Sequence, residues 1–134
     1  RSSFKEYANQ VVNNAKALSK ELSNFGFSVV SGGTDNHLML IDVTPLKLTG
    51  SEAGKKLEEV GIIVNKNMIP YDLRKPWDPS GIRIGTPSVT TRGMKEDDMK
   101  KIAELIHKTL QNKEDLGKIK TEVKSLASKF VFNG

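Results

Sequence analysis

The spacing of apolar residues in the first 25 positions constrains the fold of this chain most strongly. Apolar side chains recur there every three or four residues, the spacing of one face of an amphipathic helix. They are Phe4, Tyr7, Ala8, Val11, Ala15, Leu18, Leu22 and Phe25. Ser3 followed by Glu6 has the spacing of a capping box, and Gly26 is typical of a helix end. Such a helix needs other elements against which to bury its apolar face.

The rest of the chain alternates strand-like and helical segments. Short apolar or β-branched runs predict strands at residues 27–31, 37–43, 62–64 and 81–86. A capping box at Thr49 and Glu52 predicts a helix ending at Gly61, and apolar periodicity predicts helices from Glu96 and from Leu116. Prolines at positions 70, 76 and 79 oppose regular structure in residues 65–79. We therefore expect one α+β domain over residues 1–134, with a small antiparallel sheet and helices packed against it.

Composition narrows the class of protein. The apolar fraction is 37% and the charged fraction 28%, which is typical of a globular chain, and no apolar run is long enough to span a bilayer. The absence of cysteine excludes disulfides and thiolate metal sites. The net charge is +5, but lysines and acids are interleaved around residues 95–108. We expect no nucleic-acid or membrane partner. The alternative is a basic binding module, which would use Lys113, Lys118, Lys120, Lys124 and Lys129.

Arg83 is the most informative single residue. Its neighbours Ile82 and Ile84 should point to the opposite face of a strand, and Gly81 and Gly85 let another backbone or a ligand approach closely. An arginine on a rigid strand suits bidentate binding of a carboxylate or phosphate. An ordinary salt bridge explains the same residue about equally well.

Three segments, in order, resemble the end of serine hydroxymethyltransferase. They are Ser31-Gly32-Gly33-Thr34-Asp35-Asn36-His37, then Asn65-Lys66-Asn67 with Pro70, and then Ser80-Gly81-Ile82-Arg83-Ile84-Gly85-Thr86-Pro87. Thr91-Arg92-Gly93 follows at the family's separation, so that the likeness covers about residues 4–110. The resemblance implies the carboxy-terminal domain of a fold-type I pyridoxal-phosphate enzyme. Residues 113–134 carry no family signature and are expected to be an appended terminal helix.

The activity implied by the resemblance is interconversion of serine and glycine, with transfer of a one-carbon unit to tetrahydrofolate. Arg83 then corresponds to the arginine that binds the α-carboxylate of the amino acid, and Asn67 to the asparagine that hydrogen-bonds the folate pteridine. Lys75, Pro76 and Trp77 fall where the family has further folate contacts. The resemblance implies a cytoplasmic protein, with an organellar one as the alternative, and a complete enzyme that forms a homodimer, with a tetramer as the alternative.

The family's catalytic lysine, which forms the Schiff base with pyridoxal phosphate, has no counterpart here. His107-Lys108 resembles the end of that motif, but Glu104-Leu105-Ile106 precede it instead of threonines, and the helical pattern turns Lys108 towards solvent. We therefore expect no catalytic residue in this chain, a larger cofactor-binding domain outside it, and no turnover by residues 1–134 alone. A freestanding domain that has lost its catalytic partner is the alternative.

Asp35, Asn36 and His37 form a further polar cluster, which we interpret as a turn. No second histidine or carboxylate lies at metal-ligand spacing from them. We expect no metal site.

Overall fold

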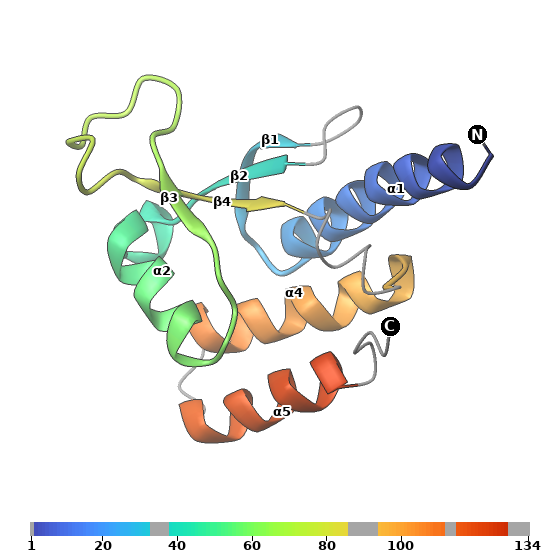
Figure 1. Ribbon diagram of the computed structural model, residues 1–134. Coiled ribbons are helices and arrows are strands. Elements are labelled where there is room, and N and C mark those ends of the chain that lie inside the picture. Colours follow the sequence, from blue (N-terminus) through green and yellow to red (C-terminus); the bar gives the residue numbers. More distant parts are fainter. Residues whose placement is uncertain (1, 33–37, 86–93, 112–114, 129–134) are drawn as a thin grey trace.

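Figure 1 shows the computed structural model, which describes residues 2–32, 38–85, 94–111 and 115–128. The described elements are α1 (Ser2–Asn24), β1 (Ser28–Gly32), β2 (Leu38–Asp42), the short 3-10 helix η1 (Thr44–Leu46), α2 (Gly50–Glu59), β3 (Asn65–Asn67), β4 (Gly81–Gly85), α4 (Glu96–Gln111) and α5 (Leu116–Ser128). Strands and helices together make an α+β domain, which confirms the predicted fold class.

The strands form one antiparallel sheet in the order β1-β2-β4-β3. The central strand β4 pairs with β2, where Arg83 lies opposite Leu40, and with β3, where Arg83 lies opposite Asn65. β3 is an edge strand. It lies three residues after the predicted position, because Asn65–Asn67 pair with β4 whereas the apolar residues 62–64 do not pair.

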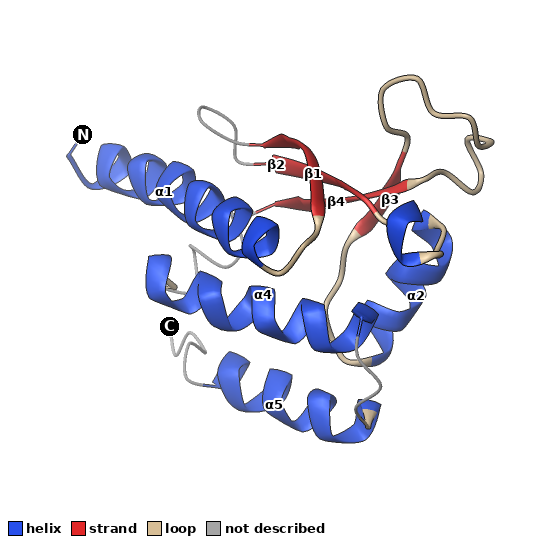
Figure 2. Cartoon of the chain, turned by 180° about the vertical axis from the view of Figure 1, so that it is seen from behind, coloured by secondary structure: helices blue, strands red, loops and turns tan. Residues whose placement is uncertain are grey.

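The helices cover one face of the sheet. In Figures 1 and 2, α4 runs beneath the sheet and α5 lies beyond α4, while the loop between β3 and β4 rises on the other side. Ile41 and Ile82 point into this layer and are completely buried. They join a core that also contains Ala15, Leu18, Leu22, Phe27, Val43, Ala53, Leu57, Ile84, Met94, Met99, Ala103, Ile106 and Leu110.

Local signals set most helix boundaries as predicted. Thr49 caps α2 with a complete capping box, in which its side chain accepts from the Glu52 amide and the Glu52 carboxylate accepts from the Thr49 amide. Gly26 and Gly61 adopt positive φ angles of 91° and 95° just after α1 and α2. The predicted cap at Ser3 is wrong, because α1 already begins at Ser2.

α5 packs against α4 through a second apolar cluster that contains Val60, Leu105 and Ile119. Charged side chains join the two helices beside it. Lys101 Nζ lies 3.0 Å from Glu104 Oε1 and 3.1 Å from Glu122 Oε1, and Lys108 Nζ lies 3.5 Å from each of the same two oxygens. Lys108 is half-buried, with 23% of its side chain exposed, so the prediction that it faces solvent holds only in part, because Glu122 of α5 lies beside it.

Candidate functional site

The site residue predicted from the glycine-flanked strand lies in the middle of the sheet. Arg83 occupies the third position of β4, and its side chain is exposed, whereas Ile82 and Ile84 on either side are buried in the core. The alternation expected of a strand is therefore confirmed here. The guanidinium projects from the face of the sheet opposite to the core.

Arg83 makes no side-chain hydrogen bond or ion pair with any other described residue. The acid nearest to it in register is Asp42, which lies opposite Gly81 at the end of β2. That carboxylate already accepts hydrogen bonds from the Thr44 amide at 3.0 Å and the Thr44 hydroxyl at 2.7 Å. Within the described residues, the alternative of an internal salt bridge at Arg83 has no support.

Gly81 leaves room for neighbouring backbone rather than for a ligand. A Cβ at this position would lie 2.9 Å from the carbonyl oxygen of Asn67 and 3.0 Å from that of Ile41. It would also lie 2.8 Å from Cγ2 of Ile69. The glycine therefore allows β2, β3 and β4 to pack closely at the base of the site.

β3 places two asparagines beside Arg83. Asn65 lies directly opposite Arg83, and Asn67 lies opposite Gly81. Cross-strand partners share a face, so both asparagine side chains lie on the face of Arg83, with the diagonal neighbour about 7–8 Å away. Asn67 Nδ2 donates to the carbonyl of Met68 at 2.8 Å, which leaves its second N–H and Oδ1 for another partner.

The loop between β3 and β4 carries the remaining predicted contacts. Lys75, Pro76 and Trp77 are all exposed, Trp77 to 69%. Lys75 and Trp77 contribute to a shallow depression of about 290 Å³, whose lining also includes Leu73, Arg74 and Asp78. The Trp77 carbonyl accepts from Lys66 Nζ at 2.7 Å, which ties this part of the loop to β3.

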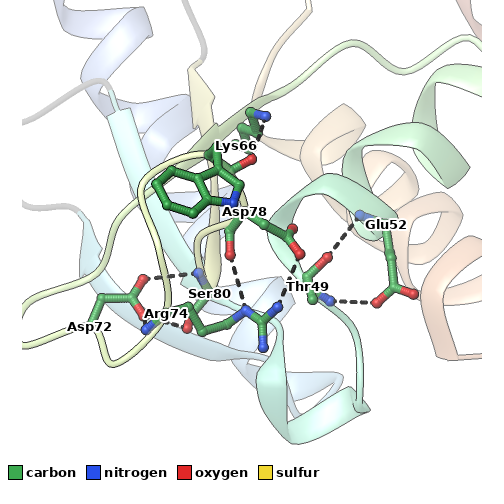
Figure 3. Close-up of polar contacts among 8 residues, drawn as sticks. Thr49, Glu52, Lys66, Asp72, Arg74, Asp78 and Ser80 are labelled. Atoms are coloured by element: carbon green, nitrogen blue, oxygen red, sulfur yellow. Dashed lines mark hydrogen bonds and ion pairs between the residues drawn. The ribbon is translucent and has the colours of Figure 1, made fainter.

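Asp72 organises the same loop. Its carboxylate accepts hydrogen bonds from the Ser80 hydroxyl at 2.6 Å and from the Ser80 amide at 2.9 Å (Figure 3). It also accepts from the amides of Arg74 at 2.9 Å and Ile69 at 3.3 Å. Partial burial favours a higher pKa, but these hydrogen bonds, led by the Ser80 hydroxyl, hold the pKa of Asp72 far below its usual range.

A second acid of the loop, Asp78, lies near the start of α2. Asp78 pairs with the guanidinium of Arg74 at 2.9 Å (Figure 3). The Thr49 hydroxyl lowers the pKa of Asp78, and Ser51 and Arg74 contribute in the same direction. Close by, the Gly50 amide donates to the carbonyl of Pro79 at 2.7 Å. The start of α2 therefore supports the end of the loop.

A comparison with known protein families identifies the family of this chain. The family model described as serine hydroxymethyltransferase matches residues 1–106. The chain belongs to the serine hydroxymethyltransferase family. The match includes α1, the whole sheet, the loop of residues 68–80 and most of α4, and α5 lies beyond it.

Several other predicted features of the chain fall partly outside the described residues. The cluster Asp35, Asn36 and His37 lies outside the described residues, as do Thr91-Arg92-Gly93. Among the lysines of the basic-module alternative, Lys118, Lys120 and Lys124 are exposed on α5, and Lys113 and Lys129 are not described. Lys118 and Lys120 are separated by about 200° around the helix axis, so they form no single stripe.

No helix in the described part of the chain combines the length and apolarity that crossing a membrane requires. Among the same residues, no group of three or more histidine, cysteine, aspartate or glutamate side chains is arranged to bind a metal ion.

Three residues that the sequence did not indicate have important positions in the structure. Asn65 shares the face of Arg83, a position that the N-x-N spacing and strand periodicity could have indicated. Asp72 follows a proline turn, where aspartate commonly accepts from nearby amides. Asn14 interrupts the apolar face of α1 and is completely buried, where its Nδ2 donates to the Met94 carbonyl at 3.0 Å.

Proposed function

We propose that this chain forms the substrate-closing domain of a pyridoxal-phosphate-dependent serine hydroxymethyltransferase. In this proposal Arg83 binds the carboxylate of serine or glycine, and Asn67 with the loop of residues 68–80 binds tetrahydrofolate. The single observation that supports it best is the exposed Arg83 guanidinium, which stands on the central strand without a partner among the described residues. Family membership supplies the reaction class.

The geometry of β4 suits recognition of a carboxylate. The core holds Ile82 and Ile84, so the backbone that carries Arg83 is fixed on both sides. A planar guanidinium can donate two parallel hydrogen bonds to a carboxylate, which sets both the position and the rotation of the amino acid. Orientation of this kind selects which bond at the α-carbon reacts.

Pyridoxal phosphate, held mainly by a domain outside these residues, would supply the electron sink for that bond change. The exposed guanidinium suits a carboxylate because Asn65 and Asn67 lie on the same sheet face and no described residue forms an ion pair with Arg83. The described residues contribute binding and orientation. Proton transfer and attachment of the cofactor belong to the part of the enzyme outside this chain.

Asn67 and the loop provide a second, separate set of contacts. A carboxamide donates and accepts at once, as the edge of a pterin ring requires, and Asn67 retains both capacities. Lys75 is an exposed cation that suits the carboxylate of a folate glutamate, and Trp77 offers an aromatic face. Pro76 restricts the backbone between them. The amino acid would therefore bind to β4, and the folate to the neighbouring strand β3 and the loop that follows it.

The test is the substitution Arg83→Lys in the complete enzyme, with Arg74→Lys as the matched control. Arg83→Lys retains the positive charge but removes the planar guanidinium that can donate two parallel hydrogen bonds. We expect KM for serine to rise about tenfold or more, since a hydrogen bond to a charged group is worth ~1.5–3 kcal/mol. Arg74 already pairs with Asp78, so its variant should leave KM for serine unchanged. Unchanged serine binding in Arg83→Lys, with normal folding, would exclude the assignment.

A further inference from the structure

We propose that Asp72 is a positioning residue for the folate side of the site, because its carboxylate fixes the loop that carries Lys75 and Trp77 onto the strand that carries Arg83. The inference rests on the proposed function and concerns a residue that touches neither ligand. It follows from the number of loop segments that donate hydrogen bonds to this one side chain.

The Asp72 carboxylate reaches the beginning, the middle and the end of the loop. It accepts from the Ile69 amide at 3.3 Å, the Arg74 amide at 2.9 Å, and the amide and hydroxyl of Ser80 at 2.9 and 2.6 Å. Each of these donors would otherwise depend on water or on another acceptor. One carboxylate therefore links the two ends of the loop to each other and to its middle.

The backbone beside Asp72 has a conformation that needs such support. The Asp72 amide donates to the Ile69 carbonyl at 3.1 Å, so residues 69–72 form a turn with Pro70 at its second position. Tyr71, at the third position, has a φ of 58°, as in a type II turn, where glycine or asparagine is usual. A bulky residue keeps this conformation only where its surroundings impose it.

The apolar core does not impose this conformation. Tyr71 and Leu73, on either side of Asp72, are each 99% exposed. Hydrogen bonds from the Ser80 amide and hydroxyl to the Asp72 carboxylate therefore connect this turn to the residue that precedes β4. Replacement of Asp72 should loosen the loop and leave the core intact.

Ser80 transmits the position of the loop to β4. Its side chain is buried, and its carbonyl accepts from the Val43 amide at 3.0 Å, so it is attached to the end of β2 as well. Ser80 directly precedes Gly81, the first residue of β4. Arg83 itself is held by pairing of β4 with β2 and β3 and does not depend on the loop. Folate contacts and amino-acid contacts should therefore respond differently to loss of Asp72.

The experiment compares Asp72→Asn and Ser80→Ala with Asp97→Asn in the complete enzyme. Asparagine places an NH₂ group against the donors that now face a carboxylate oxygen, and Ser80→Ala removes only the 2.6 Å hydroxyl bond. Asp97 is exposed on α4, far from the loop in sequence, so its variant reproduces the change of charge alone. Equilibrium dissociation constants for tetrahydrofolate and for serine are measured separately, together with amide hydrogen exchange of residues 69–80.

We expect Asp72→Asn to weaken tetrahydrofolate binding tenfold or more and to accelerate exchange in residues 69–80, with serine binding changed less than twofold. Ser80→Ala should give a smaller effect of the same kind, and it carries the test if Asp72→Asn does not fold. Asp97→Asn should match the wild type in every measurement.

Faster exchange in residues 69–80 with unchanged tetrahydrofolate affinity would overturn the proposal and leave Asp72 with a structural role only. Equal loss of serine and tetrahydrofolate binding would also overturn it, because the two sides of the site would then not be separable. Failure of the proposed function looks different, since the wild-type enzyme would bind no tetrahydrofolate or Arg83→Lys would leave serine binding unchanged.

Discussion

At the scale of single residues, the two glycines of α2, Gly50 and Gly54, should respond in opposite directions to substitution by alanine. A Cβ at Gly50 would lie 2.4 Å from the Gly81 carbonyl oxygen and 2.9 Å from that of Pro79, whereas a Cβ at Gly54 would meet nothing within 4 Å. We expect Gly50→Ala to lower the free energy of unfolding by about 1–3 kcal/mol or more, because two backbone groups must move. Gly54→Ala should raise it by up to ~1 kcal/mol through helix propensity.

Denaturant unfolding of both variants measures this difference directly. A similar change in both, of either sign, would contradict the close approach of α2 to the start of β4. The contact matters for the site, because Gly50 also donates to Pro79 and so holds the end of the loop.

Asn14 offers a second residue-scale prediction. Its buried carboxamide donates to the Met94 carbonyl and accepts from Gln10 Nε2 at 2.8 Å, and the same Gln10 nitrogen donates to Glu96 at 2.7 Å. Asn14→Ala should destabilise the chain by ~1–3 kcal/mol, because a buried carbonyl loses its donor. The neighbouring Asn13→Ala is the control. Asn13 is exposed, so thermal or denaturant unfolding should change by less than ~0.5 kcal/mol.

At the scale of elements, the attachment of α5 to α4 should depend more on apolar burial than on charge. Ile119 is completely buried against Leu105 and Val60, so Ile119→Ala should lower the free energy of unfolding by ~2–5 kcal/mol. The exposed Lys118 on the same helix provides the control, and Lys118→Ala should have little effect.

A double-mutant cycle between Lys101 and Glu122 tests the ionic contribution. Both side chains are partly exposed, at 40% and 28%, so we expect a coupling energy below ~1 kcal/mol that declines with added salt. A coupling energy that exceeded the effect of Ile119→Ala would show that charge, rather than the apolar cluster, holds α5 in place.

At the scale of the whole molecule, lowered carboxyl pKa values make stability depend on acidity. Hydrogen bonds and cations lower the pKa of Asp72, Asp78, Glu96, Glu104 and Glu122 in the folded chain. The unfolded chain, with carboxyl pKa values of about 4, therefore binds more protons in acid. The stabilisation is present above that pH and is lost as the pH falls through the folded values.

Unfolding measured between neutral pH and about pH 2 should show this loss, and Asp72→Asn should reduce its slope. Lys101 behaves in the opposite sense, because Glu104 and then Glu122 raise its pKa. Its contribution persists through neutral pH and disappears only at strongly alkaline pH. Identical acid profiles for the wild type and Asp72→Asn would contradict the hydrogen bonding of the Asp72 carboxylate.

Features that depend on neighbouring residues were determined by the sequence itself. Apolar periodicity placed the helices, the Thr49–Glu52 capping box placed the start of α2, and alternation around Ile82 and Ile84 placed Arg83 on the exposed face. These signals are local, because a helix turn, a cap and a strand pleat each involve residues within about four positions of one another.

The tertiary structure decided whatever needed contacts between distant segments. It moved the edge strand to Asn65–Asn67, where pairing with β4 outweighed the apolar run before it, and it placed Glu122 of α5 beside Lys108. It also brought Asp72 to Ser80 and gave Gly81 its tight surroundings. Strand pairing, burial and hydrogen bonds between distant segments depend on which segments come into contact in the folded chain. The local sequence of each segment does not specify those contacts.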